Sequence, residues 1–187
     1  MNKIRCAWCG TDPLYMEYHD TEWGVPVYND DKLFEFLILE TFQAGLSWIT
    51  ILRKRENFRK AFDAFDYKKI ATYKEAKYEE LLLNEGIIRN KLKIKATISN
   101  AVSFMRIQKE FGSFSKYIWA FTNGNPIKNT SNNLNEIPAT TAISGLISKD
   151  LKKRGFKFVG PTVIYAHMQA TGMVNDHVVD CFRYNEV

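Results

Sequence analysis

Apolar residues recur every three or four positions along most of this chain, a spacing that places them on one face of an α-helix. In segment 47–65, for example, Ile51, Phe58 and Phe62 share one side and basic residues occupy the other. Clear alternation of apolar and polar residues bounded by hairpin turns, the pattern of β-strands, is absent from the sequence. The sequence therefore predicts an all-α protein with about eight to ten helices.

Helix-capping residues mark where several of these helices begin and end. Asn29 or Asp30 can cap the helix that continues through residues 32–42, because either side chain can accept from the free N–H groups of a first turn. Gly86 and Gly112 follow two later apolar patterns, where a helix commonly ends on a left-handed residue. We expect a helix to end just before each glycine.

The length of 187 residues suffices for one full hydrophobic core but is short for two. Residues 123–141 are polar apart from a few apolar positions, and too little chain follows them to form a second core. We interpret this stretch as a long surface loop and expect residues 1–187 to form a single domain.

No apolar run approaches the roughly 20 residues that a membrane-spanning helix needs. The first residues, MNKIRCAWCGTD, lack the apolar centre of a signal peptide. We therefore expect a cytoplasmic location and no membrane partner. Thiols stay reduced in that compartment, so the three cysteines are better suited to a metal than to a disulfide.

Metal-ligand spacing is found close to the end of the sequence, in VNDHVVDC. His177 and Cys181 are four residues apart, which on a helix places them on one face. A structural zinc ion takes four sulfur or nitrogen ligands. The second pair is either Cys6 with Cys9, a CxxC motif that residue chemistry slightly favours, or one of these cysteines with His19. Such an ion would join the two terminal segments.

The net charge is +5, and its distribution includes two clusters of basic residues. Clusters of one sign are suited to contacts with a phosphate backbone, although they are also common on solvated helix faces. The clusters are Lys149, Lys152, Lys153, Arg154 and Lys157, and Arg89, Lys91, Lys93 and Lys95.

Residues 142–172 predict two helices joined by a tight hairpin. Gly155 can adopt a positive φ, Gly160 allows another backbone to approach, and Pro161 suits the first position of the second helix. The tip would present backbone N–H groups and a helix N-terminus beside Lys157, which is a phosphate-binding arrangement. A plain helical hairpin with glycines for geometry is the alternative.

This stretch resembles the helix–hairpin–helix of DNA repair glycosylases. In that superfamily a segment like V-D-x-H-V follows and supplies a catalytic Asp; the corresponding position here is Asn175. The position at which lyase-active members carry a nucleophilic Lys is Thr162. An amide is no general base and Thr forms no Schiff base, so the resemblance implies DNA and a flipped base but a different chemistry, without lyase activity.

Motifs along nearly the whole chain resemble the bacterial DNA-3-methyladenine glycosylase I family. They are DPLYxxYHDxEWGVP, QAGLSWITxLxKRENxR, GIIR, LKKRGFKFVG and VNDHVV. The resemblance implies a monofunctional enzyme that hydrolyses the N-glycosidic bond of 3-methyladenine in alkylated double-stranded DNA and releases the free base. Nothing in the sequence suggests more than a monomer. It also implies one structural Zn²⁺, with the ligands Cys6, His19, His177 and Cys181. A replacement of Cys6 by Cys9 remains open.

The candidate base-binding residues are a carboxylate and several aromatic side chains. Glu40 lies on the core-facing stripe of its helix, where an anion can accept from the exocyclic amine of a cationic base. Trp48 offers a stacking face, Tyr15 and Tyr18 can close the pocket, and the resemblance adds Trp8. We expect Glu40 to act in catalysis mainly by recognising the base, and activation of water by Glu40 is the alternative. Any of these aromatics is otherwise a candidate for the core.

The base leaves neutral from its cationic form, so little acid assistance is needed and water can attack the sugar. Leu46, with Gly45 before it, is the candidate wedge that fills the gap left by the flipped base; ordinary core is its alternative. The predicted DNA-binding residues are Gly45, Leu46, Gly155, Lys157 and Gly160.

Two other functions compete with this hypothesis. One is a zinc-clamped DNA-binding module without activity, and a carboxylate among aromatics argues against it. The other is a hydrolase of free nucleosides, and the basic hairpin tip argues against that.

Overall fold

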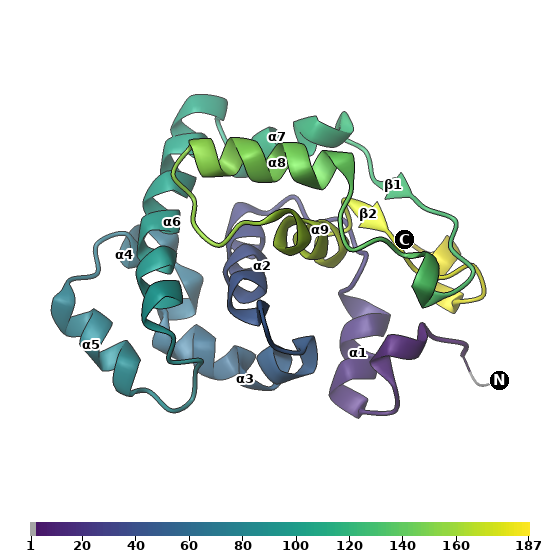
Figure 1. Cartoon of the computed structure of the whole chain (residues 1–187), viewed down its shortest axis with the longest axis horizontal. Helices are drawn as coiled ribbons and strands as arrows, with labels where there is room; N and C mark the ends of the chain where they lie inside the picture. The colour runs from purple at the N-terminus through teal and green to yellow at the C-terminus, as the bar shows by residue number, and fades with distance from the viewer. Residues whose placement is uncertain (1–2) are drawn as a thin grey trace.

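The computed structural model describes residues 3–187, and within this range the fold is almost entirely helical (Figure 1). Nine α-helices lie in the described part, in agreement with the predicted number. They are α1 (Pro13–Thr21), α2 (Asp30–Gln43), α3 (Trp48–Ala61), α4 (Tyr67–Ile70), α5 (Glu75–Leu83), α6 (Lys91–Phe111), α7 (Phe114–Trp119), α8 (Ala142–Lys153) and α9 (Pro161–Ala170).

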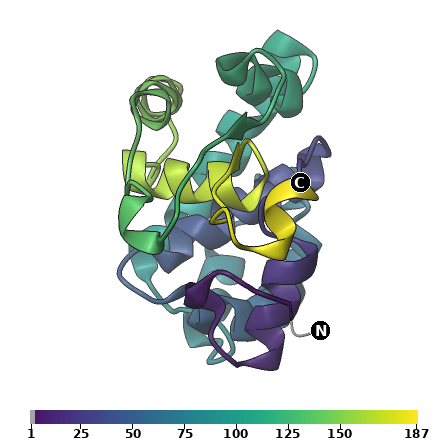
Figure 2. The same ribbon diagram turned by 90° about the vertical axis from the view of Figure 1, so that its right-hand side faces the viewer.

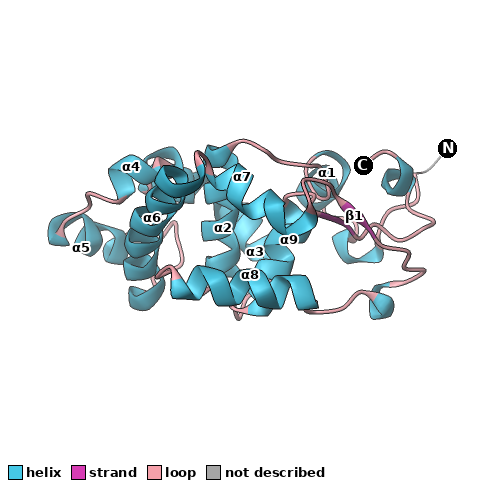
Figure 3. Ribbon diagram, turned by 90° about the horizontal axis from the view of Figure 1, so that it is seen from above, coloured by secondary structure: helices cyan, strands magenta, loops and turns pink. Residues whose placement is uncertain are grey.

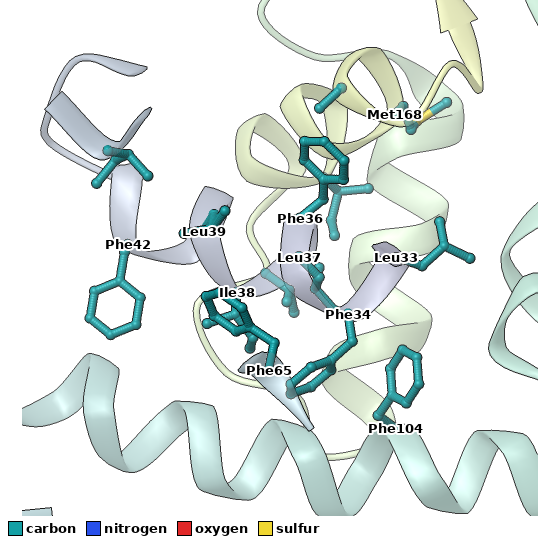
Figure 4. Close-up of a cluster of buried hydrophobic side chains, with 14 of the residues drawn as sticks. Leu33, Phe34, Phe36, Leu37, Ile38, Leu39, Phe42, Phe65, Phe104 and Met168 are labelled. Atoms are coloured by element: carbon teal, nitrogen blue, oxygen red, sulfur yellow. The ribbon is translucent and has the colours of Figure 1, made fainter. Parts of the chain in front are cut away.

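Helix α2 forms the centre of the core. All residues from Leu33 to Phe42 are buried, because α9 packs on one side of the helix and α6 on another (Figure 4). Met168 of α9 and Phe104 of α6 mark these two neighbours. A helix enclosed on all sides must be apolar nearly all round, which explains the run FEFLILETF. This enclosure also explains why a carboxylate on α2, Glu40, is buried.

Two of the three predicted helix caps are confirmed. Asn29 is the cap of α2 and accepts from the N–H of Lys32, whereas Asp30 accepts from the N–H groups of Phe114 and Ser115 and so anchors the start of α7. Gly112 ends α6 with φ 85°. The expected end before Gly86 is wrong, because α5 stops at Leu83.

The hairpin between α8 and α9, residues 154–160, has the predicted turn. Gly155 has φ 95° and Pro161 is the first residue of α9. Asn100 of α6 holds this hairpin tip: its Oδ1 accepts from the N–H of Lys157 at 2.8 Å, and its Nδ2 donates to the carbonyl of the same residue at 3.1 Å. Apart from the adjacent residues, no heavy atom within residues 3–187 lies within 4 Å of a Cβ built on Gly160, so this side of the glycine is open.

The two ends of the chain meet at one end of the molecule (Figures 1 and 2). The N–H of Phe182 donates to the carbonyl of Ile4 at 3.0 Å. Residues 123–141 run over this end as well (Figure 3) and include strand β1 (Ile127–Lys128), which pairs in parallel with β2 (Val174–Asn175). Residues 123–141 therefore form a structured segment that packs over this end of the molecule. The β1–β2 pair is the exception to the all-α prediction.

No helix within residues 3–187 combines the length and the apolarity required to cross a bilayer.

Candidate active site

A cavity of about 310 Å³ opens between α1, α2, α3, α9 and the 123–141 stretch. All five predicted base-binding residues line it, although the sequence separates them by up to 40 positions. We call this cavity the aromatic pocket. Its lining residues are Trp8, Tyr15, Tyr18, Trp23, Glu40, Gln43, Trp48, Leu134, Ile137, Pro138, Ala166 and Gln169.

Glu40 is the charged group of this lining. It is 3% exposed, and its Oε2 has no hydrogen-bond partner among residues 3–187. The expectation that a buried carboxylate has donors is therefore not met for this oxygen. Burial alone raises the pKa of Glu40 to about 8. A carboxyl without a partner and without a neighbouring cation is an unused acceptor, available to a ligand with donors and positive charge.

Aromatic rings surround the carboxyl group. The ring centroids of Tyr18 and Trp48 are 5.3 Å apart, and those of Trp8 and Tyr15 are 4.9 Å apart. Burial, with Glu40 as a lesser cause, raises the pKa of Tyr18. The indole Nε1 atoms of Trp8 and Trp48 are buried and have no hydrogen-bond partner in the described chain.

Several lining residues were not predicted from the sequence. Trp23 packs against Trp8 with centroids 5.0 Å apart, Gln43 comes from the end of α2, and Ala166 and Gln169 come from α9. Leu134, Ile137 and Pro138 form a wall that the 123–141 stretch supplies. Apolar residues within an otherwise polar loop were the available signal for this wall.

The segment after α2 carries the candidate wedge, Leu46, and Lys93 fixes the end of α2 where this segment starts. Leu46 is 41% exposed, which excludes the core alternative, and Gly45 has φ 86°. Lys93 is only 6% exposed, and its Nζ donates to the carbonyls of Phe42 at 3.0 Å and Ala44 at 2.7 Å. Lys93 thus caps the C-terminal end of α2, and its place in the basic surface cluster is wrong.

The first basic cluster is exposed at four of its five members. Lys149, Lys152, Lys153 and Lys157 face solvent near the hairpin tip. Arg154 instead binds Glu110 and Asp150, with N–O distances of 2.7 and 2.6 Å, so its charge is locally neutralised.

A second site lies where the chain ends meet. The ligand atoms of Cys6, His19, His177 and Cys181 are all buried and within 4.8 Å of one another. Sγ of Cys181 lies 3.4 Å from Nε2 of His19 and 3.4 Å from Nδ1 of His177. Ligands of one tetrahedral zinc ion are separated by about 3.5 Å when Zn–S is about 2.3 Å and Zn–N about 2.0 Å, so this spacing suits zinc.

In both histidines, the ring nitrogen that faces away from the cluster contacts an oxygen acceptor; we call it the outer nitrogen. Nδ1 of His19 contacts Oδ1 of Asp20 at 2.8 Å, and Nε2 of His177 contacts the carbonyl of Trp23 at 3.1 Å. Such contacts fix the tautomer that leaves the inner nitrogen free to coordinate a metal. Cys9 lies outside the cluster and donates its thiol to the carbonyl of Cys6, so the geometry favours Cys6 over Cys9.

Asn175 is turned away from the aromatic pocket. Its Nδ2 donates to the carbonyls of Tyr184 and Val187 at 3.0 and 2.8 Å, and its Oδ1 accepts from the N–H of His177 at 3.1 Å. Asn175 therefore holds the C-terminal segment and the metal-site histidine. Thr162 is exposed at the start of α9 and does not line the pocket.

A helical fold that holds a buried carboxylate in an aromatic pocket beside a basic hairpin is typical of DNA glycosylases, which bind a flipped base in this way. The chain belongs to the methyladenine glycosylase family, whose model matches residues 8–184.

Individual relatives agree with this family. The chain is 50% identical over 180 residues to DNA-3-methyladenine glycosylase 1 of Escherichia coli (strain K12), covering 96% of each sequence. It is similar to a crystal structure of 3-methyladenine DNA glycosylase I with a TM-score of 0.93 and 50% identity, covering 96% of this chain and 98% of the other. A Tyr-to-Phe variant of such an enzyme in complex with 3-methyladenine matches with a TM-score of 0.92 and 35% identity, covering 95% and 96%.

Proposed function

We propose that this protein is a DNA repair enzyme that excises 3-methyladenine from alkylated double-stranded DNA by hydrolysing its N-glycosidic bond. The observation that carries the proposal is Glu40, a buried carboxyl without a partner for Oε2 inside an aromatic pocket. The names of the relatives, and a relative solved with 3-methyladenine, support the same substrate.

The pocket selects positive charge. A neutral purine would leave Glu40 either protonated or ionised without a counter-charge, whereas N3-methylated adenine brings a cationic ring and an exocyclic amine that donates. Trp48 and Tyr18 supply faces on which an electron-poor ring stacks. Glu40 thus recognises the damaged base, and water, rather than a protein nucleophile, attacks the sugar.

The enzyme is monofunctional in this proposal. Lyase activity needs an amine that forms a Schiff base with the sugar. No lysine lines the aromatic pocket within residues 3–187, and Thr162 stands at the position of the lyase Lys.

DNA is bound by the α8–α9 unit, acting as a helix–hairpin–helix, and by the segment after α2. Gly155, Lys157 and Gly160 belong to the hairpin tip. The N–H groups of Gly155 and Lys157 already donate within the chain, to the carbonyl of Lys152 and to Oδ1 of Asn100. A phosphate would therefore meet the N–H of Gly160, the start of α9 and the exposed side chain of Lys157. Exposed Leu46, with Gly45 before it, fills the gap that the flipped base leaves in the duplex. These contacts and the pocket act within one glycosylase domain, supported by a continuous core.

One structural Zn²⁺ is held by Cys6, His19, His177 and Cys181. Four buried donors in a tetrahedral spacing, with the outer imidazole nitrogens engaged, support this ion. Four protein ligands leave no position open for substrate, so the ion joins the chain ends and takes no part in hydrolysis. We also propose that the enzyme acts as a monomer in the bacterial cytoplasm, where its DNA substrate lies.

The test is release of free bases from methylated duplex DNA. We expect release of 3-methyladenine by the protein, and a loss of at least about 100-fold in Glu40→Ala, because the cationic base loses its only anionic partner in the pocket. Binding of methylated DNA without release would favour a damage-sensing module, and activity on free nucleosides but not on duplex DNA would favour a nucleoside hydrolase.

A further inference from the structure

Gln169 lines the aromatic pocket from α9, and a carboxylate outside the pocket holds its amide. Nε2 of Gln169 donates to Oδ2 of Asp176 at 2.8 Å. Asp176 is 1% exposed and also accepts from the hydroxyl of Tyr165 and from Nδ2 of Asn129, both at 2.7 Å. The carboxylate is therefore fixed by three donors, two from α9 and one from the 123–141 stretch.

This contact determines which way the Gln169 amide points. An ionised carboxylate only accepts hydrogen bonds, so a flipped amide would set its carbonyl oxygen against Oδ2 and lose the bond. Oε1 of Gln169 has no hydrogen-bond partner among residues 3–187, and the side chain is partly exposed. Oε1 is thus a fixed acceptor left for a molecule in the pocket.

Depth in the pocket indicates which part of the substrate this acceptor meets. Glu40, Tyr18 and Trp48 form the buried end, at 3%, 3% and 8% exposure. Gln169 is partly exposed and Pro138 is exposed, so both belong to the solvent-accessible part of the lining. If Glu40 binds the base at the buried end, the sugar lies on the solvent side, where Gln169 can meet the anomeric carbon.

We propose that Gln169 is a catalytic residue that binds the attacking water through Oε1, and that Asp176 is the residue that positions Gln169. This inference rests on the proposed function. Asn175, at the position of the superfamily's catalytic Asp, is engaged by the C-terminal segment. Gln43, another amide of the lining, has no such carboxylate partner in the described chain, so its orientation is not fixed.

The chemical step balances without a strong base. The water oxygen forms a bond to C1′ while the C1′–N9 bond breaks. The electron pair of the C1′–N9 bond goes to the cationic base, which leaves as neutral 3-methyladenine. The proton lost by the water passes to solvent at the exposed rim. Gln169 only orients the water, since an amide does not take up this proton.

The experiment compares the single-turnover release of 3-methyladenine from methylated duplex DNA with binding of free 3-methyladenine. This binding is followed by tryptophan fluorescence, because Trp8, Trp23 and Trp48 line the pocket. In Gln169→Leu we expect the rate to fall about 10- to 100-fold, because the water loses its orientation. Affinity for the free base should stay within about twofold, because Gln169 does not hold the base. If thermal denaturation shows that Gln169→Leu is not folded, the near-isosteric Gln169→Met is used in its place.

The matched control is Gln108→Leu, which removes an amide–carboxylate hydrogen bond of the same kind away from the pocket, from Nε2 of Gln108 to Oδ2 of Asp30 at 2.6 Å. We expect its rate within about threefold of the unaltered protein. An unchanged rate in the Gln169 variants, an equal loss of free-base affinity, or an equal loss in Gln108→Leu would each overturn the inference. An unaltered protein that releases no 3-methyladenine would instead refute the proposed function.

Discussion

Glu40 shows how one residue links stability to recognition. Its carboxyl group is buried because α2 is enclosed, and burial raises its pKa from 4.5 to about 8. Between these values the carboxyl is protonated in the native state and ionised in the unfolded chain. Unfolding then releases a proton, so the free energy of unfolding contributed by this group falls as the pH rises through this window. Burial of this carboxyl therefore lowers the stability of the free protein, and its oxygen gains a hydrogen-bond donor only when a suitable base binds.

The variant Glu40→Gln should remove this pH dependence. We expect it to be more stable than the unaltered protein at about pH 8, and the gain to be smaller at about pH 5, because Gln does not titrate. Urea denaturation at both pH values measures the difference. An equal gain at both values would show that Glu40 titrates normally in the native state.

Lys93 is a second single residue with a specific role, because it fixes the segment that bears the candidate wedge, Leu46. Replacement by Met removes two charge-assisted hydrogen bonds to the end of α2, so the segment bearing Leu46 should lose its fixed position. We expect excision from duplex DNA to fall about tenfold with little change in free-base binding. Lys109→Met, at an exposed position of the same helix and outside both basic clusters, serves as the control. Equal effects of the two variants would contradict a role in positioning.

At the scale of elements, the α8–α9 hairpin uses its two glycines differently. Gly155 has φ 95°, and a Cβ there would lie 3.2 Å from the Ser103 hydroxyl. Gly160 has φ −62° and open space around a built Cβ. The first glycine is required by the fold, whereas the second is free for an external contact.

Alanine substitutions separate these roles. Gly155→Ala should lower the free energy of unfolding by about 1–2 kcal/mol because of its left-handed backbone. Gly160→Ala should leave stability nearly unchanged but weaken binding to duplex DNA, because a methyl group separates the phosphate from the backbone. Thermal denaturation and DNA titration measure the two effects. A loss of stability in Gly160→Ala, or unchanged DNA affinity, would contradict this assignment.

At the scale of the whole molecule, the proposed zinc ion would close the chain on itself. Cys6 and His19 come from the first segment and His177 and Cys181 from the last, and α1, which carries His19, also carries Tyr15 and Tyr18 of the pocket. Loosening the terminal contact would therefore disturb the aromatic wall as well as stability.

Cys181→Ser should reduce bound zinc and lower Tm by at least about 5 °C, because a tetrahedral site loses one thiolate. Cys9→Ser should retain both, because Cys9 lies outside the cluster. Elemental analysis with thermal denaturation tests the pair. Zinc lost in Cys9→Ser would place Cys9 among the ligands, and zinc retained in Cys181→Ser would remove Cys181 from them.

Local patterns determined much of this protein from the sequence alone. Helical class, the cap at Asn29, the turn at Gly155 and the start of α9 at Pro161 follow from backbone rules that involve only a few neighbouring residues. The resemblance in its motifs indicated the family and the residues that line the pocket. Each of these depends on residue type and spacing, which a sequence displays directly.

Tertiary structure decided the partners that lie far apart in the chain. Lys93 carries a charge typical of a surface, yet it is buried against the end of α2, 49 positions from Ala44. Gln169 faces the pocket with its amide fixed by Asp176, and Leu134 closes a wall from a stretch that reads as an exposed loop. A hydrogen bond or a cavity wall depends on the position of its partner in space, and spacing along the chain does not specify that position.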